Sequence, residues 1–190
     1  LDLVAALRDE GEADVLLALR SPLGFIDDQI AAAAGADTER CQRAWLAATF
    51  APAFEALGWD AGANEPDHVR LRRAALLGLA GDLGCAPGLV AAATFERIER
   101  YLADRMSLDA NLVDSVVTLA ARHGDARRYE AFERAMLAAD TPQERRRFLL
   151  ALGEFREPAL IARTLDATLG DRVPTQDVAM LLMKLLGNRA

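Results

Sequence analysis

Residues 141–170 read TPQERRRFLLALGEFREPALIARTLDATLG and contain two helix beginnings and two helix ends. Thr141-Pro142-Gln143-Glu144 is a capping box with proline at the first helical position, in which a hydroxyl and a carboxylate satisfy free N–H groups reciprocally. Gly153 ends this helix, Pro158 begins the next one and Gly170 ends it. The stretch therefore predicts two short helices whose tight connection makes them pack antiparallel.

The same design extends through the rest of the chain. Apolar side chains recur at three- and four-residue spacing in almost every segment, and each helix carries an apolar stripe that we expect to be buried. We expect a break at Ser21-Pro22 and a kink at Pro52. The predicted helices run from Leu1 to Asp9, Glu12 to Ala34, Asp37 to Leu57, Asp67 to Leu83 with its end at Gly84, Pro87 to Asp104, Asp109 to Gly124, Asp125 to Leu137, Thr141 to Gly153, Pro158 to Gly170, and Pro174 to Gly187.

Composition supports an all-α fold. Alanine and leucine dominate, whereas the β-branched and aromatic residues that strands prefer are scarce. Antiparallel helix pairs with one apolar face each cannot bury that face alone, so we expect them to stack into a HEAT-like right-handed solenoid. We find no long linker, and we predict one helical-repeat domain over residues 1–190.

The net charge of the chain and its sequence signals limit the kinds of partner and the location that we expect. The formal net charge is −7, which disfavours wholesale binding to nucleic acid, and no apolar run is long enough to span a membrane. The preference for arginine over lysine, together with the alanine content, indicates a GC-rich and therefore bacterial genome. Because the chain begins at Leu1 rather than at a methionine and ends without a closing polar segment, we expect a piece of a longer protein, so the lack of a visible signal peptide says little about the parent. We expect a cytoplasmic location, with the periplasm as the alternative.

Candidate catalytic and metal-binding residues are few. The two histidines, His68 and His123, have no histidine partner at helical spacing, and Cys41 and Cys85 form no CxxC motif. A self-contained zinc site needs three or four ligands. We therefore expect structural histidines, two buried or half-buried thiols and no metal in this chain, and an independent all-α enzyme is the weakest hypothesis.

Three separated segments carry a family resemblance. The first is Leu3 to Glu10; the second is Leu57-Gly58-Trp59, followed by an acidic loop and Leu71-Arg72-Arg73. The third runs from Val173-Pro174-Thr175-Gln176-Asp177 through an apolar helix to Gly187-Asn188-Arg189. In order and spacing, over nearly the whole chain, they resemble the C-terminal helical domain of aminopeptidase N-like zinc metallopeptidases, the group of the endoplasmic-reticulum and insulin-regulated aminopeptidases.

The resemblance implies a fold and a role. It implies a HEAT-like bowl that closes over a thermolysin-like catalytic domain of the same polypeptide and encloses the chamber where peptide N-termini are trimmed. The zinc, its H-E-x-x-H ligands and the G-A-M-E-N motif would lie upstream, so no catalytic residue is carried over and this chain alone should be inactive. The family usually adds helices after the position of Ala190, so we expect exposed apolar surface near that end.

The resemblance also suggests which residues contact peptide and which ones stabilise the fold. Arg72 and Arg73 could hold an acidic group by bidentate contact, and Gln176 and Asp177 could contact peptide or serve only as helix-start residues. Gly58 is expected to end its helix in a left-handed cap, and Trp59 to cover the seam between adjacent helical pairs. The alternative function is a stand-alone helical-repeat scaffold that binds another protein.

Overall fold

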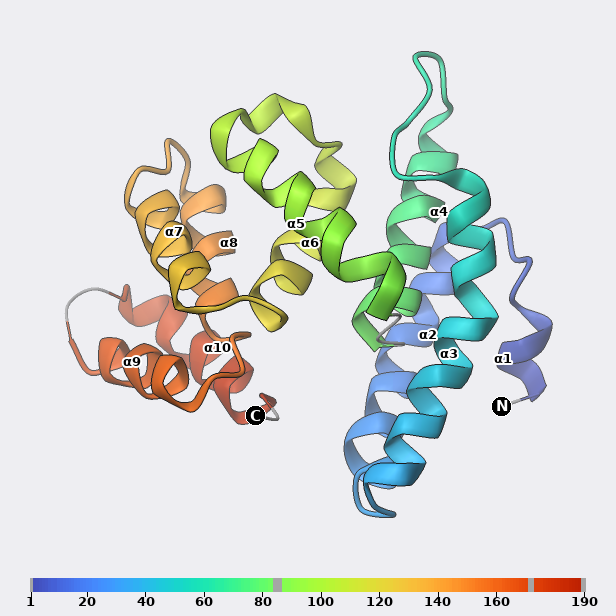
Figure 1. Ribbon diagram of the computed structural model, residues 1–190, viewed down its shortest axis with the longest axis horizontal. Helices are drawn as coiled ribbons and strands as arrows, with labels where there is room; N and C mark the ends of the chain where they lie inside the picture. Colours follow the sequence, from blue (N-terminus) through green and yellow to red (C-terminus); the bar gives the residue numbers. More distant parts are fainter. Residues whose placement is uncertain (1, 84–86, 171–172, 189–190) are drawn as a thin grey trace.

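The computed structural model describes residues 2–83, 87–170 and 173–188. Throughout these ranges the chain is helical and forms no strand, which confirms the all-α fold. Figure 1 shows a bent array in which the N-terminal helices lie on one side, the C-terminal helices on the other, and α5 and α6 between them. The right-handed sense of the array remains a prediction.

The helices follow one another with short connections. Their bounds are α1 Asp2–Ala6, α2 Ala13–Phe25, η1 Ile26–Ala31, α3 Ala36–Leu57, α4 Asp67–Leu77, η2 Gly78–Leu83, α5 Pro87–Ala103, η3 Arg105–Ser107, α6 Ala110–Arg122, α7 Ala126–Leu137, α8 Pro142–Leu152, α9 Pro158–Thr168 and α10 Thr175–Leu186. Here η1 and η2 are π-helical and η3 is a 3₁₀ turn.

Helix α6 connects two parts of the molecule. On one side it packs against α4 and η2, which belong with α2, η1 and α3 to what we call the N-terminal block. On the other side it packs against α8, which belongs with α7, α9 and α10 to the C-terminal block. The buried apolar side chains of both blocks and of α6 form one continuous core.

The cap predicted at Thr141 is present, and two further helices begin with a side-chain cap. The side chains of Asp109, Asp125 and Thr141 accept hydrogen bonds from backbone N–H groups in the first turns of α6, α7 and α8. The Glu144 carboxylate, predicted to complete the capping box at Thr141, instead pairs with Arg105 of η3. The Glu144 side chain thus links the start of α8 to the neighbouring turn.

Two long helices differ from the prediction. The break expected at Ser21-Pro22 is wrong, because α2 runs through Pro22 and continues into η1. Ala18 and Pro22 are both exposed, so water can satisfy the carbonyl that proline leaves without a donor. The helix over 67–83 changes from α to π at Gly78, where an added Cβ would lie 3.0 Å from the Arg20 guanidinium. Glycine therefore allows α2 to approach η2 closely.

The surface of the C-terminal block exposes more apolar side chains than we expected from the sequence. Leu137, Leu165, Leu169 and Leu186 belong to the apolar patterns of their helices, but they are exposed, with Leu169 and Leu186 more than four-fifths accessible. Met180 and Met183 of α10 are exposed as well. The buried face of each of these helices therefore includes only part of its apolar residues. An exposed apolar surface near the C-terminal end is present, as expected.

The structure describes one of the two cysteines and allows a search for membrane-spanning helices. Cys41 is exposed on α3, so the expectation of a buried or half-buried thiol is wrong there. Cys85 and the helix end predicted at Gly84 lie outside the described residues. Within the described ranges, none of the helices has the length and apolarity needed to cross a bilayer.

Candidate functional site

The loop between α3 and α4 begins at Gly58, which has a φ of 67° and a ψ of −177°. The positive φ agrees with the predicted glycine stop, but the extended ψ differs from a left-handed cap. The Gly58 N–H still closes the helix by donating to the Phe54 carbonyl at 2.9 Å. The chain therefore leaves α3 abruptly and turns toward α4 and α5.

Arg73 of α4 fixes this loop. Its Nε donates to the Gly58 carbonyl at 2.8 Å and its Nη2 to the Leu57 carbonyl at 3.3 Å. Its two terminal nitrogens donate to the Glu65 carboxylate, each at 2.6 Å. The hydrogen bond from Arg73 lowers the pKa of Glu65, and the bond to Glu65 raises the pKa of Arg73. One buried guanidinium thus satisfies carbonyls at the end of α3 and holds the far end of the loop.

Trp59 lies half-buried between α3 and α5. Its ring meets Phe54 edge to face, with centroids 5.0 Å apart, and the Arg97 guanidinium lies 4.4 Å from the ring centroid. Arg97 also pairs with Asp60 at 3.3 Å. The side chain contacts both helices, and its partial exposure leaves one part facing the surface.

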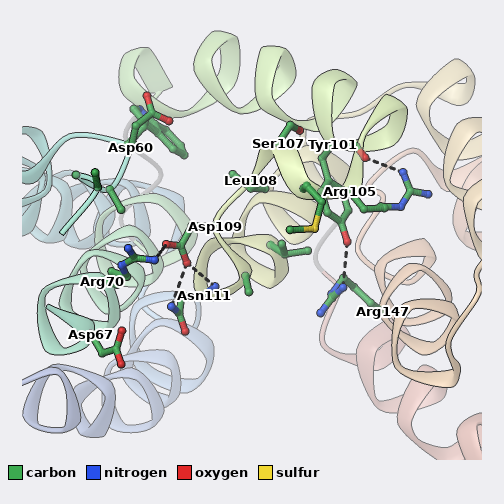
Figure 2. Close-up of a pocket in the computed structure, with 17 residues that line it drawn as sticks. Asp60, Asp67, Arg70, Tyr101, Arg105, Ser107, Leu108, Asp109, Asn111 and Arg147 are labelled. Carbon is green, nitrogen blue, oxygen red and sulfur yellow. Dashed lines mark hydrogen bonds and ion pairs between the residues drawn. The ribbon is translucent and has the colours of Figure 1, made fainter. Parts of the chain in front are cut away.

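That surface is a groove at the N-terminal end of α6, which we call the α6 groove (Figure 2). It has a volume of about 630 Å³ and is bounded by the 59–63 loop segment, α4, the end of α5, η3, the start of α6, and α8. Its aromatic and charged lining residues are Trp59, Asp60, Asp67, Arg70, Tyr101, Arg105, Asp109 and Arg147. Elements of both blocks therefore contribute to one groove.

Arginines organise the interior of the α6 groove. Arg70 pairs with Asp109 at 3.5 Å, and Arg147 Nη1 donates to the Tyr101 hydroxyl at 3.2 Å. Arg105 Nη1 donates to the carbonyls of Tyr101 and Leu102, each at 2.7 Å. The Arg105 guanidinium also lies 5.1 Å from the Tyr101 ring centroid. The groove presents fixed guanidinium groups beside aromatic rings, an arrangement that can donate hydrogen bonds to carboxylate and carbonyl oxygens.

A second depression, the α8–α10 groove, begins at the same arginine. It has a volume of about 590 Å³, and Arg147 lines both grooves. Leu150 and Met180 give it an apolar portion, and Arg146 and Lys184 give it cations. The two grooves thus meet at Arg147, in the middle of α8.

Glu154, which follows the C-cap of α8, lines the second groove. It accepts from Arg122 Nε at 2.8 Å and from Lys184 Nζ at 2.6 Å. Burial raises the pKa of Glu154, but the charges and hydrogen bonds of Arg122 and Lys184 outweigh burial, so the pKa lies below its ordinary value. The carboxylate is therefore held ionised between two cations.

The four predicted peptide contacts are not brought together. Arg72 and Arg73 lie on α4, whereas Gln176 and Asp177 lie on α10 in the other block (Figure 1). Arg72 Nε donates to the Glu10 carbonyl at 2.7 Å, and Arg73 is only 2% exposed. A peptide could reach Arg73 only after the contacts that hold the loop were broken.

On α10, Asp177 is buried and pairs with Arg146 at 3.0 Å, whereas Gln176 is exposed. The helix-start reading of Asp177 fits its place in the first turn of α10. None of the four predicted residues lines either groove. The residues that do line the grooves include Arg70 and Arg147, which belong to arginine runs visible in the sequence.

A zinc site does not fit the described part of this chain. Among the residues that the structure describes, no three histidine, cysteine, aspartate or glutamate side chains are grouped so that they could hold a metal ion. His68 lies on α4, and His123 directly follows the last residue of α6. Burial, followed by the charges of Arg156 and Arg122, lowers the pKa of His123.

Comparison with known proteins identifies the family. No curated protein matches the chain. A family model described as the ERAP1-like C-terminal domain matches residues 1–190, the whole sequence. The resemblance seen in the sequence is therefore confirmed, and the chain belongs to the family of ERAP1-like C-terminal domains.

Proposed function

We propose that this chain is the non-catalytic C-terminal domain of a zinc aminopeptidase, where it encloses part of the active-site chamber and contacts the distal part of the peptide. Membership of the ERAP1-like family supports a peptidase as the parent protein. The zinc would belong to a catalytic domain elsewhere in the same polypeptide. Family membership does not favour the alternative of a stand-alone scaffold.

The observation that supports peptide contact most directly is the α6 groove. A peptide main chain offers carbonyl oxygens, and its C-terminus offers a carboxylate. Arg70, Arg105 and Arg147 provide guanidinium groups around the groove, and Tyr101 and Trp59 provide rings that can pack against side chains. The adjoining α8–α10 groove extends the surface past Arg147, so an extended peptide could follow both.

A comparison of two proteins tests the assignment to a peptidase. The chain alone and the full-length parent protein are assayed for zinc content and for hydrolysis of amino-acid anilides. We expect the parent to hold zinc and to cleave, and the chain alone to do neither. A parent that is equally inert and free of zinc would overturn the proposal.

A variant in the parent protein tests the role of the groove. Arg147→Ala removes the guanidinium shared by both grooves. We expect KM for long peptides to rise several-fold, with kcat and the cleavage of a short anilide unchanged. Arg145→Ala, an exposed neighbour outside both grooves, is the matched control. Equal KM values for Arg147→Ala and the control would exclude peptide contact at this groove.

A further inference from the structure

The two walls of the α6 groove differ in charge. The wall formed by the loop after α3 and by α4 carries Asp60 and Asp67. The opposite wall, formed by the end of α5, by η3 and by α8, carries Arg105 and Arg147. Figure 2 shows the two aspartates on one side of the groove and these two arginines on the other. A ligand in the groove therefore meets carboxylates on one side and guanidinium groups on the other.

The arginines of the basic wall are compensated by carboxylates outside the groove. Arg105 pairs with Glu144, and Arg147 pairs with Asp114. Neither Glu144 nor Asp114 lines the α6 groove. The two guanidinium groups therefore offer hydrogen bonds to a ligand, but their charge already has a partner.

The carboxylates of the acidic wall are compensated less fully. In the part of the chain that the structure describes, Asp67 has no ion-pair partner, and its side chain is exposed. Asp60 pairs with Arg97 at 3.3 Å, yet the Asp60 side chain remains 84% exposed. Between the two walls, Asp109 pairs with Arg70 at 3.5 Å. Two carboxylates on the acidic wall are therefore open to a cationic group of a ligand.

The distribution of charge along the chain acts in the same direction. Residues 1–83, which include the acidic wall, hold fourteen acidic and seven basic side chains, whereas residues 84–190 hold fifteen of each. The whole net charge of −7 thus belongs to the first part of the chain. Charges that line a cleft focus the electric field there and raise the local concentration of ligands of opposite sign. The field of the N-terminal block should therefore draw cationic groups toward the acidic wall.

The acidic wall also offers apolar surface. Trp59, Ala61 and Ala63 line it beside the aspartates. A lysine or arginine side chain packs its apolar stem on such a surface while its charged end stays in water. A basic side chain therefore fits both the charge and the apolar surface of this wall, and an acidic side chain fits neither.

We propose that Asp67, together with Asp60, makes the α6 groove selective for peptides that present basic side chains toward α4. Asp67 has the larger part in this selectivity, because Asp60 already holds Arg97. The inference rests on the proposed function in one respect, which is that the ligand of the groove is a peptide.

Binding of three peptides to the unchanged chain tests the preference. The peptides have equal length and differ only in carrying lysine, glutamine or glutamate at alternate positions, because alternate side chains of an extended peptide point to one face. Isothermal titration calorimetry measures each Kd. The lysine peptide should bind several-fold more tightly than the glutamine peptide, and the glutamate peptide should bind most weakly. These differences should shrink as salt is added.

Variants separate the effect of the groove from that of the overall charge. Asp67→Asn should remove most of the preference for lysine, and Asp67→Lys should reverse it in favour of the glutamate peptide. Asp140→Asn makes the same change in net charge as Asp67→Asn at an exposed position that lines neither groove, and it should leave the preference unchanged. Thermal unfolding followed by circular dichroism verifies that each variant is folded.

The outcomes distinguish this selectivity from the proposed function. Equal Kd values for the three peptides would overturn the selectivity alone, and so would a preference for lysine that Asp67→Asn leaves intact. A preference that Asp140→Asn lowers as much as Asp67→Asn does would assign the effect to net charge and would overturn it as well. Failure of all three peptides to bind would contradict peptide contact at the groove, and therefore both proposals.

Discussion

Packed aromatic rings hold the centre of the C-terminal block, whereas one arginine holds the loop that closes α3 in the N-terminal block. Phe132 lies against Phe148 and Phe155, with ring centroids 5.3 and 5.7 Å apart. Arg73 instead uses directed hydrogen bonds to Glu65 and to two backbone carbonyls. Apolar packing stabilises without fixing a precise orientation, while a guanidinium fork fixes one. The fork is found where a loop must be positioned as the edge of a groove.

Truncating the aromatic cluster should have the largest effect on stability. Phe132 is fully buried, so Phe132→Ala should lower the free energy of unfolding by about 3–5 kcal/mol. Urea unfolding followed by circular dichroism measures the change. Leu137→Ala, at an exposed position on the same helix, should change it by no more than about 0.5 kcal/mol. Similar losses for both variants would show that the rings do not dominate this block.

Removing the guanidinium of Arg73 should lower the free energy of unfolding by a somewhat smaller amount. Arg73→Met keeps an apolar stem but leaves two carbonyls and Glu65 without their donor, and we expect a loss of about 2–3 kcal/mol. Arg73→Lys should recover only part of it, because an ammonium group lacks the planar fork. If Lys restores full stability, charge alone holds the loop and the contrast with the aromatic block weakens.

Trp59 lies between these two cases, because it is an aromatic residue held partly by an arginine. Trp59→Ala should lower the free energy of unfolding by about 2 kcal/mol, less than for a fully buried ring, since one part of Trp59 faces the α6 groove. Trp59→Phe should retain most of the stability through the contact with Phe54. A loss below about 0.5 kcal/mol for Trp59→Ala would remove its packing role.

Lowering the pH should reveal a smaller, electrostatic contribution of Glu154 to the free energy of unfolding. Because its pKa is lowered in the folded protein, its contribution is complete above the pKa of an unfolded-chain glutamate and is lost as pH falls through the folded-state pKa. The loss of stability with acid should therefore be less steep in Glu154→Gln than in the unchanged chain. Unfolding free energies measured from neutral to acidic pH test this, and identical pH dependence in both proteins would contradict it.

The sequence predicted the helices more reliably than their exposed faces. Caps such as Asp109 and Thr141 depend on neighbours in sequence, so their residues alone indicate them. Leu169 and Leu186 show the limit, because apolar spacing does not reveal which side of a helix has a neighbour. The passage through Pro22 depends in the same way on exposure, which is a tertiary property.

The candidate site was harder to predict than the fold. Arg73 and Arg147 both lie in arginine-rich segments, yet one is buried beneath a loop and the other lines two grooves. Their difference is set by partners 8 to 46 residues away, Glu65 for Arg73 and Tyr101 for Arg147. The sequence shows that both segments are rich in arginine. The role of each arginine depends on how separate helices pack around it.

The position of Trp59 gives the protein a built-in optical reporter. The sequence holds two tryptophans, and Trp45 lies on α3 against the core, away from the residues that line the α6 groove. A Trp45→Phe protein would thus emit from a single indole at the edge of the groove, with the Arg97 cation next to its ring. Occupancy of the groove by an unlabelled peptide would then be visible as a change in emission wavelength or intensity, without an attached dye.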